Sequence, residues 1–234
     1  PSTILDVDME EVDFSWYGGG RLNACFNCVD RHLATQPEKT AIIWAQDEPG
    51  EYRHITYREL KHQVARIANV LLAHGVKRGD RVLIYMPMIA QAAFAMLACT
   101  RIGAIHSVVF GGFASSSLAS RIDNAEPLVI VSADAGSRSG KVVPYKGLLD
   151  EAIRLAKHKP AKVLMVDRGM AGYEPVSGRD ADYATLRAQH MDDVVPCVWL
   201  EATDPSYTLY TSGTTGSPKG VQRDTGGYAV ALAA

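Results

Sequence analysis

The sequence predicts an α/β protein with a doubly wound, mainly parallel sheet that helices cover on both faces. Two observations lead to this fold class. Short runs that are apolar along almost their whole length alternate with segments of helical periodicity, and such strands are typical of parallel sheets buried on both faces. The composition agrees, because 47% of the 234 residues are hydrophobic and 21% are charged, as in ordinary globular domains.

The alternating region begins near Tyr57. Its first helix places apolar residues at helical spacing from Leu60 to Leu72, and Gly75 supplies a stop signal. Strands and helices are then expected to alternate through residue 166. The expected strands span residues 81–86, 105–110, 128–132 and 162–166. The expected helices after the first one span residues 90–101, 115–124 and 148–157.

Two flanking regions lack this alternation of strands and helices. Residues 1–40 are predicted to form an extended arm with an acidic start and a short helix at 23–34. Residues 167–206, which contain several Gly, Pro and Asp, are predicted to form a surface excursion with one short helix. The apolar run that ends at Ala234 has no helix cap, so the natural chain is expected to continue.

The composition excludes several classes of function. Lys and Arg total 24 against 26 Asp and Glu, so no broad electrostatic surface for nucleic acid is expected. The longest apolar stretch, Tyr85 to Cys99, is interrupted by Pro87 and Gln91 and is too short to span a bilayer. Four cysteines without an apolar leader indicate a reducing compartment, and a cytoplasmic location is expected.

A glycine- and hydroxyl-rich loop spans residues 210–220, between a strand-like segment and an expected helix. Its glycines let backbone N–H groups turn toward one centre, its hydroxyls add donors, and Lys219 brings a mobile cation, as a polyphosphate requires. It lacks the Gly-Lys-Ser/Thr of a Walker A motif. The alternative is a flexible polar linker. The candidate ATP phosphate-binding residues are Thr211, Ser212, Gly213, Thr214, Thr215, Gly216 and Lys219.

A second anion site is expected at residues 133–141, which follow a predicted strand and so lie at the carboxyl edge of the sheet. Arg138 can meet a phosphate as a planar fork and Lys141 as a point charge, and Gly136 and Gly140 lie beside them. The alternative is a pair of solvated surface cations in a loop.

Two further features are not interpreted as sites. Cys25, Cys28 and His32 have the spacing of three zinc ligands, but no second Cys/His pair lies nearby in the sequence. Cys99 and Cys197 each stand alone in apolar segments, so we expect neither a metal site nor a redox function for these cysteines. His106, which lies between strand-like residues, is expected to be a structural histidine with satisfied hydrogen bonds.

Several segments resemble the AMP-forming short-chain acyl-CoA synthetases of the adenylate-forming superfamily. The loop at residues 210–220 is similar to their phosphate-binding signature, with Ser217 where many relatives have lysine. After the loop, the sequence Gly-Val-Gln-Arg-Asp at 220–224 resembles the propionate-activating members, whereas acetate-activating members usually carry Leu-His there. Further likenesses are spread over nearly the whole chain, at residues 29–32, 81–88, 95–104 and 106–113.

The resemblance implies a two-step reaction. A carboxylate, with propionate preferred, attacks the α-phosphate of Mg²⁺-ATP to give an acyl-adenylate and pyrophosphate, and the thiol of coenzyme A then displaces AMP. The loop would cradle the β- and γ-phosphates, and Lys219 would neutralise the pyrophosphate. Two cations would lie near the 3′-phosphate of coenzyme A, beside a Phe-Gly-Gly wall for its nucleotide. The residues implied for coenzyme A are Phe110, Gly111, Gly112, Arg138 and Lys141.

The resemblance also implies how the chain is divided and which molecules it binds, and alternative functions stand beside it. Residues 1–40 would be the N-terminal arm of this family and residues 41–234 the first part of its AMP-binding domain. The expected partners are a small carboxylate, ATP and coenzyme A, with neither nucleic acid nor membrane. Alternatives are an acetate-specific enzyme of the same branch, a P-loop-type kinase that would release ADP, and a non-catalytic nucleotide- or coenzyme A-binding module. The acyl pocket, magnesium ligand and catalytic lysine would lie beyond Ala234, so the 234 residues alone are expected to be inactive.

Overall fold

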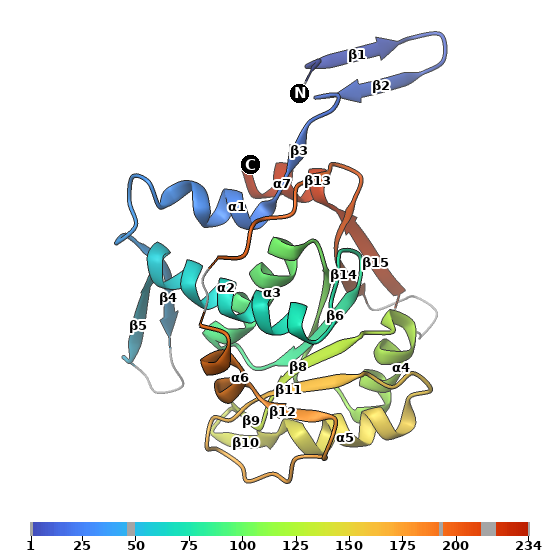
Figure 1. The fold of residues 1–234 in the computed structure, drawn as a ribbon. Coiled ribbons are helices and arrows are strands. Elements are labelled where there is room, and N and C mark those ends of the chain that lie inside the picture. Colours follow the sequence, from blue (N-terminus) through green and yellow to red (C-terminus); the bar gives the residue numbers. More distant parts are fainter. Residues whose placement is uncertain (1, 46–49, 192–193, 212–218, 234) are drawn as a thin grey trace.

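A seven-stranded sheet forms the centre of the fold in the computed structural model, which describes residues 2–45, 50–191, 194–211 and 219–233 (Figure 1). Neighbouring strands are parallel except for the last pair, β14 and β15, which confirms the doubly wound, mainly parallel architecture. The strands in spatial order are β12 (Asp180–Asp182), β11 (Lys162–Val166), β8 (Val129–Ala133), β6 (Arg81–Met86), β7 (Ile105–Phe110), β14 (Pro205–Thr211) and β15 (Lys219–Asp224).

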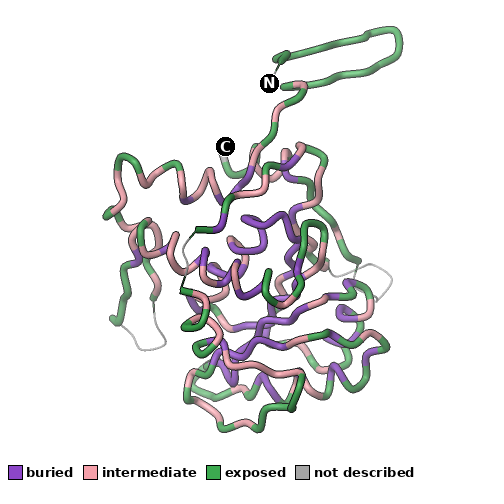
Figure 2. The backbone as a smooth tube through the Cα atoms, in the orientation of Figure 1, coloured by how far each residue is buried: buried purple, intermediate pink, exposed green. Residues whose placement is uncertain are grey.

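Helices cover both faces of this sheet, and the buried residues lie between the layers (Figure 2). Alternation along β6 shows the arrangement, because Val82 and Ile84 join one apolar cluster while Leu83 and Tyr85 join the other. One face packs against α2 (Tyr57–Ala73), α3 (Ala90–Ile102) and α6 (Tyr183–Gln189). The other face packs against α4 (Ser115–Ala125) and α5 (Tyr145–Leu155).

Local signals explain where the main helices begin and end. The hydroxyl of Thr56 accepts a hydrogen bond from the backbone N–H of Glu59, which caps the start of α2. Gly75, with φ of +85°, follows the end of α2. Helix α3 ends at Gly103, which adopts the left-handed conformation at φ of +73°. The strands expected at 81–86, 105–110 and 162–166 are found with those bounds.

The N-terminal region contains more structure than an extended arm. Strands β1 (Leu5–Asp8) and β2 (Asp13–Trp16) form an exposed hairpin that projects from the body, and the helix expected at 23–34 breaks at Val29 (Figures 1 and 2). Two further pairings were not predicted. The elements are α1 (Ala24–Cys28), the 3-10 turn η1 (Asp30–His32), β3 (Arg21–Leu22) paired with β13 (Leu200–Glu201), and β4 (Thr40–Ala45) paired with β5 (Tyr52–Thr56).

The segment predicted as a surface excursion also contributes to the sheet. It carries the expected short helix, α6, but also β12, which pairs in parallel with β11. Asp180 of β12 has an almost fully buried side chain, and it forms ion pairs with Lys146 at 3.0 Å and Arg179 at 2.6 Å. These cations compensate the buried carboxylate, so a strand with a polar sequence can join the sheet.

None of the helices in the described ranges is both long enough and apolar enough to cross a membrane.

Candidate functional site

The two segments predicted to bind anions end at the same edge of the sheet. Strand β7 ends at Phe110 and strand β14 at Thr211, and the two strands run parallel with Tyr207 opposite His106. Strand β8, which is separated from β7 by β6, ends at Ala133 and leads into the second predicted segment. Open parallel sheets bind ligands outside the carboxyl ends of their strands. The fold therefore brings both candidate segments to the edge where a ligand is expected.

The predicted phosphate loop connects two antiparallel strands. Thr211 at the end of β14 and Lys219 at the start of β15 are register partners, and both are exposed. We call β14, β15 and their connection the phosphate hairpin. The predicted residues inside the connection lie outside the described residues; they are Ser212, Gly213, Thr214, Thr215 and Gly216.

A helix follows this loop as expected, but a strand that was not predicted lies between them. The chain first forms β15, and helix α7 (Thr225–Ala233) begins only afterwards. Backbone pairing with β14 stabilises β15 as the outermost strand. Its residues are mostly exposed, so the sequence shows none of the apolar alternation that marks a half-buried strand.

The residues predicted for coenzyme A gather into one surface, which we call the Arg138 platform. The guanidinium of Arg138 lies over the ring of Phe110, 5.4 Å from its centre, and Phe110 is 60% exposed. A Cβ added at Gly112 would lie 2.4 Å from the Phe110 ring and 2.7 Å from Arg138 Nη1, so a larger residue would have to displace one of these exposed side chains. The platform comprises Phe110, Gly111, Gly112, Arg138 and Lys141.

Tyrosines support the platform from the core. A Cβ at Gly111 would lie only 2.0 Å from Tyr145 Oη. The hydroxyl of Tyr85 donates to the carbonyl oxygen of Gly111 at 3.3 Å, and the two tyrosine rings lie 5.1 Å apart. Burial raises the pKa of both tyrosines, so both stay protonated donors at neutral pH. Sequence reasoning did not identify either tyrosine as part of the site.

The two predicted cations lie side by side on a hairpin rather than in a loop. Strands β9 (Ala135–Arg138) and β10 (Lys141–Pro144) pair antiparallel with Arg138 opposite Lys141. The two connecting residues, Ser139 and Gly140, have φ of +50° and +73°. Positive φ at both positions is the signature of the type I′ turn, which suits a two-residue hairpin. The turn therefore fixes the relative positions of the two charges.

Helix α4 supplies a link between the platform side and the phosphate hairpin that the sequence analysis missed. The guanidinium of Arg121 lies 4.1 Å from the ring centre of Phe113, which follows β7, and 5.4 Å from that of Tyr210 in β14. Asn124 accepts a hydrogen bond from the Tyr210 hydroxyl at 2.7 Å. The spacing of three residues, which puts Arg121 and Asn124 on one helix face, is the signal that could have identified them.

His106 is buried, but its hydrogen bonding differs from the expectation. Its Nδ1 has no hydrogen-bond partner among the described residues, so it is not a satisfied histidine. Its ring stacks on Tyr207 of β14 with centres 5.6 Å apart. Burial lowers the pKa of His106 to about 4. The ring is therefore neutral at physiological pH and supports the phosphate hairpin by packing.

The structure is an open, mainly parallel α/β sheet with its candidate segments at the carboxyl edge, which is the architecture of α/β ligand-binding domains. Residues 29–234 match the family of AMP-binding enzymes, and the chain belongs to that family.

Individual proteins give a consistent picture. The chain is 60% identical to a propionate–CoA ligase of Escherichia coli over 218 residues, which is 93% of this chain and 35% of that protein. It is 51% identical to an acetyl-coenzyme A synthetase of Methylorubrum extorquens over 223 residues, 94% of this chain and 34% of that protein. The solved acetoacetyl-CoA synthetase of Streptomyces lividans superimposes with a TM-score of 0.83 at 31% identity, covering 97% of this chain and 34% of that one. The chain thus spans about a third of the length of the relatives it matches.

Proposed function

We propose that the whole protein activates a short-chain carboxylate, propionate in the first place, with Mg²⁺-ATP and transfers the acyl group to coenzyme A. The observation that carries this proposal is the 60% identity to a propionate–CoA ligase, which extends over 93% of the chain. Acetate is the second candidate substrate, because identity to an acetyl-coenzyme A synthetase reaches 51% over a similar length. We place the activity in the cytoplasm, where the four free cysteines would stay reduced.

In the first step, a carboxylate oxygen attacks the α-phosphorus of ATP and pyrophosphate leaves. Donors of the phosphate hairpin would hold the β- and γ-phosphates, and the ammonium of Lys219 would stabilise the charge that develops on pyrophosphate. Such preorganised charge stabilisation is a large term in enzymatic catalysis. The exposed position of Lys219, opposite Thr211 at the mouth of the loop, supports this role.

In the second step, the thiol of coenzyme A attacks the acyl carbon and AMP leaves. The Arg138 platform would hold the nucleotide end of coenzyme A. Arg138 would bind the 3′-phosphate as a fork and Lys141 as a point charge, with the glycine backbone of Gly111 and Gly112 against the nucleotide. The position of Gly112, which is exposed and lies directly beside Phe110 and Arg138, supports this assignment.

The experiment uses a chimera in which this chain replaces the matching segment of the Escherichia coli propionate–CoA ligase. The purified chimera is incubated with propionate, Mg²⁺-ATP and coenzyme A, and the nucleotide products are separated. Release of AMP and pyrophosphate that depends on all three substrates is the expected result. Release of ADP would indicate a kinase instead, and ligand binding without ATP consumption would indicate a non-catalytic module.

The 234-residue chain alone is the companion sample, and we expect no turnover from it. The resemblance assigns the acyl pocket, the magnesium ligand and the catalytic lysine to other segments. Orientation of the two reacting groups accounts for about 7–11 kcal/mol of barrier lowering, so an incomplete site should not react measurably. Turnover of about 1–10 s⁻¹ by this chain alone would contradict that expectation.

A further inference from the structure

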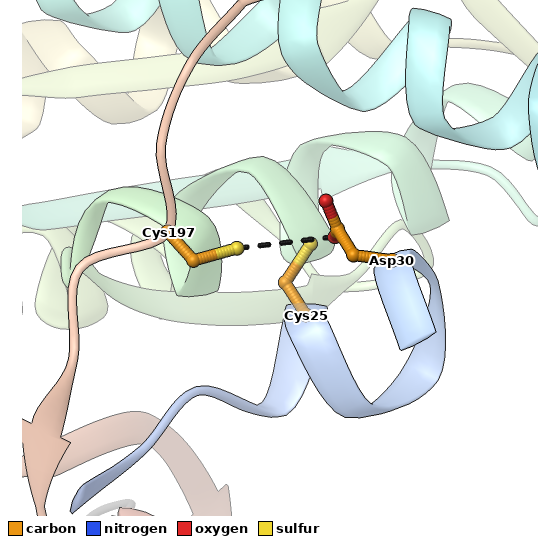
Figure 3. Close-up of side chains that lie close together, drawn as sticks. All are labelled: Cys25, Asp30 and Cys197. Carbon is orange, nitrogen blue, oxygen red and sulfur yellow. Dashed lines mark hydrogen bonds between the residues drawn. The ribbon is translucent and has the colours of Figure 1, made fainter. Parts of the chain in front are cut away.

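Three side chains from distant parts of the sequence converge beside α3 (Figure 3). Cys25 lies on α1, Asp30 begins the turn η1, and Cys197 lies in the irregular segment before β13. The two sulfur atoms and one carboxylate oxygen are all within 4.8 Å of one another. The expectation that Cys197 stands alone is therefore wrong. Cys25 is fully buried and Cys197 is half-buried, so one thiol is protected while solvent reaches the other.

A positive side chain already occupies the place where a metal ion would be expected. The guanidinium of Arg101 donates to both carboxylate oxygens of Asp30, at 2.8 and 2.9 Å, and lies 3.6 Å from Cys25 Sγ. Arg101 is itself only 4% exposed and is held by a hydrogen bond to the carbonyl oxygen of Val195. A zinc ion here would be repelled by this fixed charge and would compete with it for Asp30. The cluster favours chemistry between the two thiols.

The surroundings make these two thiols unequal. A hydrogen bond with Cys25 lowers the pKa of Cys197, and Arg101 adds to this shift. Burial opposes the shift, and so does Asp30, whose Oδ2 accepts a hydrogen bond from Cys197 Sγ at 3.8 Å. The same hydrogen bond, together with burial, raises the pKa of Cys25. Cys197 is also the thiol that solvent can reach, so a dissolved oxidant meets it before the fully buried Cys25. The thiolate is the reactive form of cysteine.

We propose that Cys25 and Cys197 form a reversible disulfide when the protein meets hydrogen peroxide. The Cys197 thiolate attacks one peroxide oxygen, the O–O bond breaks and hydroxide leaves, which gives a sulfenic acid. The sulfur of Cys25 then attacks the sulfur of Cys197, the S–O bond breaks, and the oxygen leaves as water with the thiol proton. In total, two thiols and one peroxide give one disulfide and two waters. An external dithiol reverses the oxidation by thiol–disulfide exchange.

The disulfide would add a covalent bond where the N-terminal arm, residues 1–40, already contacts the rest of the fold. The side-chain amide of Asn23 donates to the carbonyl oxygens of Thr100 and Val198, at 2.8 Å each. The short β3–β13 pairing lies next to this contact in the chain. A bond between residues so far apart in sequence restricts the unfolded chain strongly, so oxidation should hold the arm more firmly.

The experiment exposes the 234-residue chain to hydrogen peroxide, blocks the remaining thiols and maps crosslinked peptides by mass spectrometry without reduction. The expected result is a Cys25–Cys197 crosslink that dithiothreitol removes and that raises the thermal midpoint by about 5 °C. Cys197→Ser should abolish both the crosslink and the shift. Cys28→Ser is the matched control, because Cys28 lies on the same short helix and this variant should behave like the wild type.

The outcomes that would overturn the proposal are distinct. They are a crosslink between Cys25 and Cys28, oxidation of Cys197 to sulfinic acid without any crosslink, and protection of both thiols from alkylation by added zinc. Cys25→Ser replaces a fully buried residue and could fail to fold. Circular dichroism identifies that case, and Cys197→Ser then decides the question by itself.

Discussion

The Arg138 platform and the phosphate hairpin stand at one edge of the same sheet but are built differently. The platform rests on the core, since Gly111 contacts the buried Tyr145 and no side chain larger than hydrogen fits there. The phosphate hairpin ends in β15, the outermost strand, whose side chains are mostly exposed. Packing thus shapes the platform, whereas the described residues of β15 are mostly exposed and include the cation Lys219. Substitution of the packed glycine Gly111 should therefore cost stability, whereas substitution of an exposed cation such as Lys219 should cost activity.

The largest effect is expected from Lys219→Ala in the chimera described above. If the ammonium of Lys219 neutralises pyrophosphate as proposed, its loss should slow ATP–pyrophosphate exchange by about 10²–10³-fold. Thioester formation from pre-made acyl-adenylate should change much less, and so should the thermal midpoint. Arg223→Ala removes another exposed cation from the same strand and is the matched control. An equal loss in both half-reactions would point to a damaged strand rather than a missing charge.

The next effect concerns His106, which packs under the phosphate hairpin. Its pKa is about 4 in the folded chain against an ordinary value of 6.5, so between these limits the unfolded chain binds a proton that the folded chain does not. The titration of His106 therefore does not affect the free energy of unfolding above pH 6.5. As the pH falls toward 4, it lowers that free energy by about 3 kcal/mol. His106→Phe keeps a ring against Tyr207 and cannot titrate. The free energy of unfolding of this variant should therefore fall by about 3 kcal/mol less than that of the wild type between pH 6.5 and pH 4.

Urea unfolding of both proteins at pH 7, 5.5 and 4 measures this difference. Comparing slopes with pH, rather than absolute stabilities, separates the titration from any change in packing that phenylalanine introduces. If the variant and the wild type lost stability equally over this range, another group would be responsible for the acid sensitivity.

Alanine substitution should affect stability differently at two glycines in or near the platform, and the expected effect is smaller than that of His106. Gly111→Ala places a Cβ 2.0 Å from Tyr145 Oη, so the free energy of unfolding should fall by about 1–3 kcal/mol. Gly147 lies in α5, and a Cβ there meets nothing within 4 Å. Gly147→Ala should therefore be neutral or stabilise by up to about 1 kcal/mol through helix propensity. Similar urea midpoints for the two variants would contradict a packed platform.

The smallest effect is expected when Arg138 and Lys141 are both replaced by alanine in the chimera. The KM for coenzyme A should rise about tenfold, while ATP–pyrophosphate exchange stays near normal. Coenzyme A and its 3′-dephospho form are compared to test the cause, because the double variant should no longer distinguish them. If the unsubstituted chimera used coenzyme A and its 3′-dephospho form equally well, this would contradict the proposed phosphate contact.

The sequence predicts those strands that are buried on both faces, and the reason is physical. Burial on two faces forces a continuous apolar run, as in β6, β7, β8 and β11, and such a run is visible without a structure. Strand β12 does not follow this rule, because its Asp180 is compensated by Lys146 of α5 and by Arg179, the residue directly before the strand. Strand β15 escapes it because an exposed outer strand needs no apolar residues.

The same distinction applies to the candidate sites. Phe110, Gly111 and Gly112 are consecutive, and Arg138 and Lys141 are close in the sequence, so a motif could identify them. Tyr145 and Arg121 contribute through contacts that only the folded chain creates, and so does the meeting of Cys25 with Cys197. Short-range motifs reveal ligand-binding segments, whereas their supports come from long-range packing.

The strand order also has a consequence for how the chain folds. Strands β6, β7 and β8 are connected by single helices, but β14 must return to β7 after about a hundred intervening residues, with Tyr207 opposite His106. Closing so long a loop slows that pairing, so β14 and its hairpin should join the sheet after the central strands. A nucleotide held by the hairpin would then bind only the completely assembled sheet. Ligand occupancy would consequently report the last step of folding, and it would draw the assembly to completion by mass action.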